Sequence, residues 1–322
     1  MDRPTPKAKA VTLFRILICT VAILALTGAI TYMVRDVILD LNNTNRLLAN
    51  AFMGAMPKET EPALTEEKET ATQPPQKVAI VDADLSVSRP TITNYTAYSI
   101  DEKELAERKL AYYSYGTSPL VLILHSHPDE GYAPAGASSV PSDYPFVEQD
   151  PQNNVFAVGE VISDLLTTTG IGNIHVSERI EDPKKTIETY LRQYPSIQFV
   201  LDLHRDGLYT EDGRIVATKG ELNGERAAQL MLAVGTGDNA DGFDFRGNLA
   251  AAYTLAAQMT EAEPQIMRPI LLRPEGLHQQ YAPCSLSLYV GTTGNTLSDA
   301  LASARFFARY FAIFILNARS YG

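Results

Sequence analysis

The order of apolar and polar stretches along the chain predicts alternating strands and helices. Two short and almost fully apolar runs, 121–124 and 198–203, are typical of buried strands in a parallel sheet. Apolar residues at helical spacing predict amphipathic helices over 154–169, 183–194, 248–260 and 297–314. Further strands are expected at 92–98, 174–176, 228–234, 268–272 and 285–290, with a turn at 222–225. This alternation predicts an α/β domain over 119–318, with a mostly parallel sheet flanked by helices.

The N-terminal part of the chain has the pattern of a membrane anchor. Residues 16–33 carry no charge, and eighteen residues at ~1.5 Å each span ~27 Å, which predicts one transmembrane helix over 16–34. The basic residues of 1–15 predict a cytoplasmic N-terminus and an exported C-terminal domain. The rival interpretation, a cleaved signal peptide, is disfavoured by the length of the run and the absence of a small-x-small site. We expect residues 35–77 to be a juxtamembrane segment and flexible linker, and 78–118 to be a lead-in to the domain.

Charge and cysteine content narrow the possible functions. The formal net charge of -11 argues against a nucleic-acid partner that is bound through a basic surface. The two cysteines, Cys19 and Cys284, lie in the predicted anchor and in the domain, so we expect no intrachain disulfide.

Both apolar runs lead directly into histidines and carboxylates. The first is followed by His125-Ser126-His127-Pro128-Asp129-Glu130, and the second by His204-Arg205-Asp206. The carboxyl ends of parallel strands meet at one edge of a sheet, so these side chains are expected close together. Nitrogen and oxygen ligands with one open position are what a hydrolytic Zn²⁺ requires. The pattern predicts a zinc site with ligands drawn from four residues: His125, His127, Glu130 and His204.

Several roles at this site stay open at the level of the sequence. His125 and His127 are two residues apart, and either one could be the direct ligand while the other orients it. Arg205 and Asp206 could anchor a substrate or pair with each other.

Many short motifs, in order along the chain, resemble the stage II sporulation protein P family. The segment 125–132, His-Ser-His-Pro-Asp-Glu-Gly-Tyr, is similar to the HTHTSESY-type motif of that family. The segment 201–206, Leu-Asp-Leu-His-Arg-Asp, is similar to its LDIHRD motif. Shorter matches, such as Asn94-Tyr95-Thr96 and Gly294-Asn295-Thr296-Leu297, extend the resemblance over most of residues 90–315.

The resemblance implies a membrane-anchored peptidoglycan hydrolase of spore engulfment, with a zinc amidase-like fold. Such an enzyme would cleave the N-acetylmuramoyl-L-alanine amide, and also stem-peptide cross-links, in the septal intermembrane space. A lytic transglycosylase would be its partner. The zinc ligands would come from the 125–130 motif and from His204.

This chain departs from the family pattern at one position that matters for catalysis. The family usually has a glutamate in its last core strand, where this chain has Tyr289. That carboxylate would be the general acid and base, and a tyrosine with an ordinary pKa near ~10 is a poor base at neutral pH. Tyr289 could instead stabilise an oxyanion, and Glu275, Asp129 or Asp206 could take over the proton transfer. A second departure is a shorter loop over 175–184.

Three hypotheses follow. The first is a zinc-dependent amidase, with Tyr289, Glu275, Arg205 and Asp206 as candidate catalytic residues. The second is a catalytically impaired scaffold that still binds zinc and peptidoglycan. The third is a membrane-tethered structural module without metal.

Overall fold

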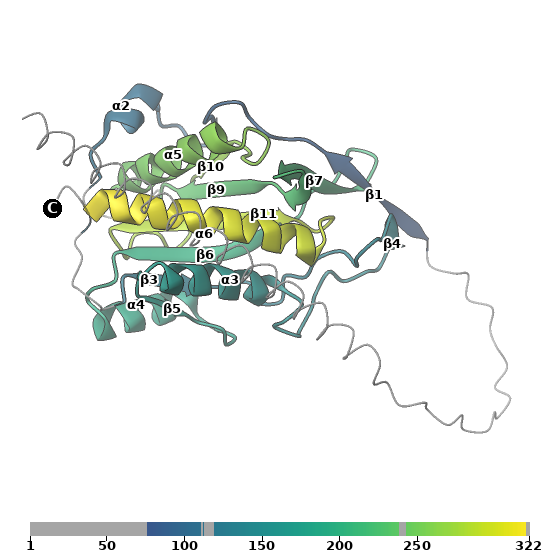
Figure 1. Cartoon of the computed structure of the whole chain (residues 1–322), viewed down its shortest axis with the longest axis horizontal. Coiled ribbons are helices and arrows are strands. Elements are labelled where there is room, and N and C mark those ends of the chain that lie inside the picture. Colours follow the sequence, from purple (N-terminus) through teal and green to yellow (C-terminus); the bar gives the residue numbers. More distant parts are fainter. Residues whose placement is uncertain (1–75, 111, 113–118, 238–242, 320–322) are drawn as a thin grey trace, which may run out of the picture. The chain divides into compact units, whose positions relative to one another are not determined.

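The computed structural model describes residues 76–110, 112, 119–237 and 243–319 (Figure 1). The predicted anchor over 16–34, and the linker up to residue 75, lie outside these residues. None of the helices in the described ranges is long and apolar enough to span a membrane.

The main sheet of the described domain has seven strands, in the order β2-β10-β9-β11-β6-β3-β5. Its members are β2 (Ile92–Asn94), β3 (Val121–Leu124), β5 (Asn173–His175), β6 (Phe199–Asp206), β9 (Leu230–Gly235), β10 (Ile270–Arg273) and β11 (Cys284–Thr292). Within this sheet only β9 and β11 pair in antiparallel fashion, and the other neighbours are parallel. The predicted mixed α/β fold with a mostly parallel sheet is therefore confirmed.

A second, four-stranded sheet was not predicted. It has the order β4-β1-β7-β8 and consists of β1 (Lys77–Ala83), β4 (Ser139–Pro141), β7 (Ile215–Leu222) and β8 (Glu225–Ala228). The predicted turn at 222–225 connects β7 to β8, with positive φ at Asn223 and Gly224 as a tight hairpin turn requires. The hydroxyl of Thr292, at the carboxyl end of β11, donates to the carbonyl of Val216 at 2.5 Å. This contact places the second sheet beyond the carboxyl end of β11.

Two strand predictions need correction. The predicted strand over 228–234 is two strands, β8 and β9, separated by Gln229. The buried amide of Gln229 donates to Asp84 and to two backbone carbonyls, and this side-chain bonding interrupts the run. The second apolar run does not end before His204, because β6 continues to Asp206 alongside β11.

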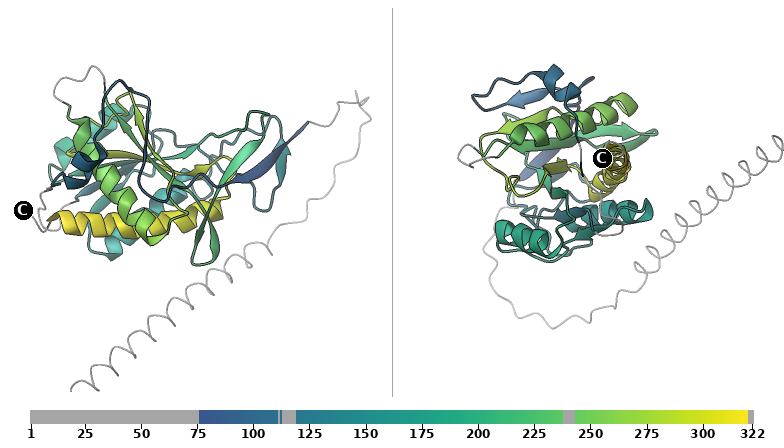
Figure 2. Two further views of the ribbon diagram at one scale, coloured as in Figure 1. Left: turned by 90° about the horizontal axis from the view of Figure 1, so that it is seen from above. Right: turned by 90° about the vertical axis from the view of Figure 1, so that its left-hand side faces the viewer.

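The five described helices cover the two faces of the main sheet unequally (Figures 1 and 2). They are α2 (Glu102–Glu107), α3 (Val155–Thr168), α4 (Pro183–Gln193), α5 (Phe245–Ala262) and α6 (Leu297–Arg319). Val121 and Ile123 of β3 belong to the large core with α3, α5 and α6. Leu122 and Leu124 belong to a smaller core with Ile187 of α4. Successive residues of a strand point to opposite faces, so α4 lies on the face opposite α3, α5 and α6.

The same alternation assigns the remaining strands to the two faces. On β6, Leu201 and Leu203 enter the large core, so Asp202 and His204 point to the α4 face. On β11, Leu288 and Val290 enter the large core, so Tyr289 shares the face of His204. The α4 face therefore carries the polar chemistry of the sheet.

Candidate metal centre

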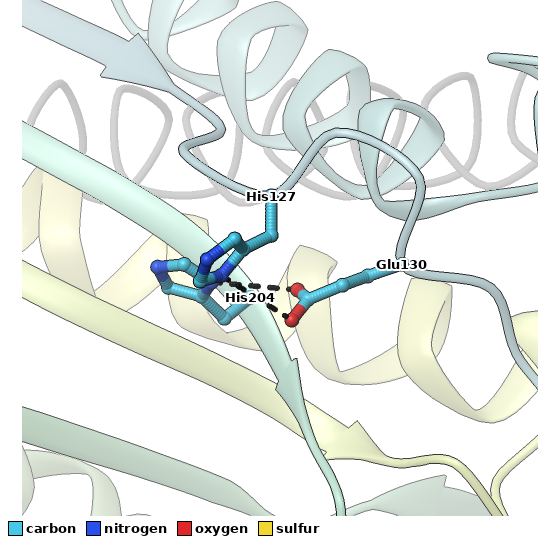
Figure 3. A group of neighbouring side chains, drawn as sticks. All are labelled: His127, Glu130 and His204. Atoms are coloured by element: carbon cyan, nitrogen blue, oxygen red, sulfur yellow. Dashed lines mark ion pairs between the residues drawn. The ribbon is translucent and has the colours of Figure 1, made fainter. Parts of the chain in front are cut away.

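Three predicted ligands meet at the carboxyl ends of β3 and β6 (Figure 3). Ligand atoms of His127, Glu130 and His204 all lie within 4.8 Å of one another. The two carboxylate oxygens of Glu130 lie 3.9 Å from Nδ1 of His127 and 3.4 Å from Nδ1 of His204. His204 and Glu130 are largely buried and His127 is exposed, so the group opens to solvent on one side.

Backbone hydrogen bonds fix the turn that carries Glu130. Its carbonyl accepts from the amide of Val155 at 3.1 Å, which ties the turn to the first residue of α3. Its carboxylate accepts from the amide of Arg205 at 2.9 Å. The Arg205 guanidinium donates to the carbonyls of Gly131 and Phe146 at 2.9 and 3.1 Å. The turn after β3 is thus bound to β6 by both the backbone and the side chain of Arg205.

The His204 ring shows that these residues fit a metal ion. Its Nδ1 atom is buried and makes no hydrogen bond of normal geometry. Its contact with Glu130 at 3.4 Å is an ion pair and not a hydrogen bond. A buried polar atom without a hydrogen bond is costly, and a metal ion held by His204 and Glu130 together would satisfy this nitrogen. The donor set of two imidazoles and one carboxylate matches catalytic zinc sites.

Asp202 is a residue of this site to which the sequence analysis gave no role. Its carboxylate accepts hydrogen bonds from the amide and hydroxyl of Ser126 at 2.9 and 2.8 Å, and it forms an ion pair with Nε2 of His204 at 3.2 Å. Burial disfavours a charged His204, but Asp202 and Glu130 outweigh it and raise the pKa of His204 to about 10. The signal in the sequence was the i, i+2 spacing, which places Asp202 and His204 on one face of β6.

His125, a predicted ligand, lies apart from the other three. It is 1% exposed, and its Nε2 lies 2.8 Å from Nε2 of His175. Nδ1 of His175 lies 3.2 Å from a carboxylate oxygen of Glu160. His125 continues the alternation of Val121 and Ile123 and so faces α3, whereas the following turn returns His127 to the other face. This geometry favours His127 over His125 as the direct ligand.

Tyr289 packs directly against the candidate metal ligand His204. The two residues are register partners on β11 and β6, and their rings stack with centroids 5.0 Å apart at 23°. Burial, followed by the negative charge of Glu130, raises the pKa of Tyr289 to about 12. The phenol is therefore protonated at neutral pH and can donate a hydrogen bond.

The other candidate catalytic residues each have a partner of their own. Arg205 and Asp206 do not pair with each other, because neighbouring side chains of a strand point to opposite faces. Asp206 pairs with Arg268 at 2.9 Å, across the face that carries Tyr289.

The carboxylates of the two loops are also paired. Glu275 accepts from Arg273 at 3.0 and 3.2 Å, and hydrogen bonds from its own backbone and from Arg273 lower its pKa. Asp129 accepts from Arg179 at 2.6 Å, so the turn of the metal site is also tied to the loop after β5.

The comparison with curated proteins found no match. Among solved structures, the chain is similar to the N-acetylmuramoyl-L-alanine amidase AmiC2 of Nostoc punctiforme (15% identity, TM-score 0.40, 64% of this chain and 98% of that one). It is also similar to N-acetylmuramoyl-L-alanine amidase from Clostridium difficile 630 (11% identity, TM-score 0.40, 63% and 97%). A third is the catalytic domain of CwlV from Bacillus (Paenibacillus) polymyxa var. colistinus (12% identity, TM-score 0.38, 62% and 97%). At these values the likeness does not by itself assign a function.

The family model of stage II sporulation protein P matches residues 40–312, which is most of the chain. The match includes both histidine motifs and the strand that carries Tyr289. The chain therefore belongs to the stage II sporulation protein P family.

Proposed function

We propose that this protein is a zinc-dependent peptidoglycan hydrolase that cleaves the amide between N-acetylmuramic acid and the L-alanine of the stem peptide. The observation that carries the proposal is the His127, Glu130 and His204 group, in which the buried Nδ1 of His204 lacks a hydrogen-bond partner. Membership of the sporulation family supports peptidoglycan as the substrate.

These three residues would hold the zinc ion. When bound, zinc supplies a Lewis acid for the scissile carbonyl and lowers the pKa of a water molecule. The protein's own contribution begins with orientation. Asp202 holds Nε2 of His204, which leaves Nδ1 directed at Glu130, and the amide of Arg205 holds the Glu130 carboxylate.

Tyr289 is the residue that we assign to the developing negative charge on the scissile carbonyl oxygen. Its raised pKa keeps the phenol protonated, and its ring lies on His204. One donor of this kind typically contributes ~10²–10³-fold in rate.

The site lacks the glutamate that would accept and donate protons at position 289, so another residue must take this role. Asp206 and Glu275 line the same cavity as Tyr289, but Glu275 is bound to Arg273, three strands away from His204. Asp206, two residues beyond His204 on β6, is therefore the candidate proton acceptor. The Asp206 carboxylate is bound to Arg268, and hydrogen bonds from the Glu275 backbone and from Arg273 lower the pKa of Glu275. We therefore expect slower turnover than in an enzyme with a glutamate at position 289.

The second candidate function is a scaffold that binds zinc and peptidoglycan without cutting. The observation that favours it is Tyr289 at the position where the family pattern has a glutamate. One experiment separates the two functions: zinc analysis of the purified full chain, then digestion of peptidoglycan by the natural protein and by Tyr289→Glu, with products read by mass spectrometry.

Hydrolysis by the natural protein that is lost in His204→Ala supports the amidase. Cleavage by Tyr289→Glu alone supports the scaffold. If neither cuts while zinc is bound at the site, the amidase proposal fails.

The predicted anchor would hold the domain on the outer face of the cell membrane, in the septal intermembrane space of a sporulating cell. A lytic transglycosylase that cuts the glycan strands would be a natural partner for an enzyme that removes stem peptides. Protease added outside intact protoplasts should digest residues 76–322 and leave the N-terminus protected. Protection of the whole chain would contradict this topology.

A further inference from the structure

A cavity of about 750 Å³ lies on the α4 face of the main sheet, where helices do not cover it. Its volume is in the usual range for small-ligand sites. The cavity crosses five strands of this sheet. Each strand contributes to its wall: Thr93 of β2, Leu271 and Arg273 of β10, Met231 of β9, Tyr289 of β11 and Asp206 of β6. The alternation of the strands explains this lining, because Ile270 and Leu272 of β10 point into the large core instead.

The cavity begins beside the candidate metal centre. Tyr289 lines it and stacks on His204, and Asp206 lies two residues beyond His204 on the same face of β6. If the scissile amide of a substrate lies at His204, one of the two parts of the substrate that this amide joins would therefore lie in the cavity. On that side the cavity extends across β11, β9 and β10.

The strand register gives the reach of this part of the substrate. His204 of β6 pairs with Tyr289 of β11, which pairs with Met231 of β9. Arg273 of β10 pairs with Gly235, four residues after Met231 on β9. Arg273 therefore lies three strands from His204 across the sheet and four residues away along the strand direction. At ~4.8 Å per strand and ~3.3 Å per residue, the Cα atoms of Arg273 and His204 are roughly 20 Å apart. An arginine side chain covers several ångströms of this span. A peptide of four residues, at up to ~3.5 Å each, covers the remaining ~14 Å.

The far end of the cavity carries an arginine that holds a carboxylate. Arg273 donates through Nε and one Nη nitrogen to both oxygens of Glu275, at 3.0 and 3.2 Å. The two side chains are 41% and 55% exposed, and exposed ion pairs of this kind contribute little to stability. A planar guanidinium fork is suited to bidentate carboxylate binding. Glu275 thus occupies the position that a carboxylate of a ligand would take.

We infer that this cavity binds the stem peptide, and that Arg273 receives the terminal carboxylate of a tetrapeptide in place of Glu275. The inference rests on the proposed function for the nature of the substrate. It assigns the peptide arm to the open face of β10 and β9, where Leu271 and Met231 offer apolar contacts. Glu275 then acts as an internal competitor for the ligand's carboxylate.

Binding of two matched peptides to the purified full chain tests the inference. The probes are L-alanyl-γ-D-glutamyl-L-lysyl-D-alanine with a free C-terminus and the same peptide as its C-terminal amide, each titrated by calorimetry. The free acid should bind the natural protein ~10–100-fold more tightly, as expected for a charged bidentate pair. Arg273→Gln should remove this preference. Glu275→Gln should strengthen binding of the acid several-fold and leave the amide almost unchanged.

Arg214 supplies the matched control. It forms the same kind of exposed pair with a carboxylate two residues away, Asp212, and it does not line the cavity. Arg214→Gln should keep the full preference for the acid. Equal affinities for the two peptides, or a preference that survives in Arg273→Gln, would overturn the inference.

Peptidoglycan digestion by the same samples separates this inference from the proposed function. Muropeptide release without discrimination between the two peptides rejects the cavity assignment and keeps the hydrolase. Discrimination that depends on Arg273, without any release by the natural protein, supports the cavity and rejects the hydrolase.

Discussion

Asp202→Asn is the substitution that tests how the candidate metal centre is oriented. The Asp202 carboxylate is buried and is surrounded by donors: it accepts hydrogen bonds from the amide and hydroxyl of Ser126 and pairs with Nε2 of His204. Asparagine has nearly the same shape, but its NH₂ group must face one of these donors. The substitution therefore removes a charge and breaks at least one hydrogen bond without changing the volume.

The expected cost is a loss of zinc affinity. Removing a carboxylate that orients a histidine ligand typically weakens metal binding ~10–100-fold. At ~1.4 kcal/mol per factor of ten, this is about 1.4–2.8 kcal/mol of binding free energy. The dissociation constant is measured at pH 7 by competition with a chromophoric chelator, on the full chain purified without metal.

Asp299→Asn is the control, because Asp299 is also buried and bound to an arginine, Arg226, but lies outside the metal group. It should bind zinc as tightly as the natural protein does. The reasoning is refuted if Asp202→Asn keeps the natural zinc affinity while its unfolding temperature shows that it is folded. A second refuting result is equal weakening in both variants.

Three further predictions concern the surroundings of the site. Gly159→Ala should lower the unfolding temperature by several degrees, because an added Cβ would lie 2.4 Å from Nε2 of His175 and 2.7 Å from Nε2 of His125. In Gly247→Ala the nearest atom is 3.9 Å away, so this helical control should be neutral or stabilising, and equal effects in thermal melts would contradict the argument. Tyr289→Phe keeps the ring that lies on His204 but loses the hydroxyl, so we expect unchanged zinc affinity and about 10²–10³-fold slower muropeptide release. An equally active Phe variant would show that the hydroxyl has no role. The pKa of His204 is about 10 in the folded protein, against an ordinary value of 6.5, so folding favours the protonated imidazole. The metal-free protein should therefore lose stability as the pH rises from about 6.5 towards 10, where the folded state gives up this proton. Urea unfolding at pH 6.5 and 9.5 measures this loss, and His204→Gln should reduce it.

The local patterns of the sequence were enough to predict the elements near the site. Val121–Leu124 is apolar throughout because both of its faces are buried, and such a run can be recognised without knowing its neighbours. The helix of α3 follows from its apolar spacing and from Asn154, which caps its first turn. The family resemblance of the two histidine motifs was likewise present in the residues themselves, and the family match confirms it.

The second sheet and the set of candidate metal ligands depended on contacts between distant parts of the chain. Strand β1 pairs with β7, about 135 residues later, and its short, mostly apolar sequence gives no sign of that partner. The sequence alone does not distinguish His125 from His127, because both are histidines in the same short motif. The turn after β3 directs His125 towards His175 and His127 towards Glu130.

The sequence by itself determined which side chains follow the buried strands. One strand leads into a turn with histidines and carboxylates, and a second strand carries another histidine. The tertiary structure decided which atoms meet. Asp202 reaches His204 because the two share one face of β6, and Arg273 reaches the cavity of Tyr289 because β10 lies two strands from β11. Element type follows from short-range periodicity, but the pairing of strands is set by the burial of whole faces, which no single segment encodes.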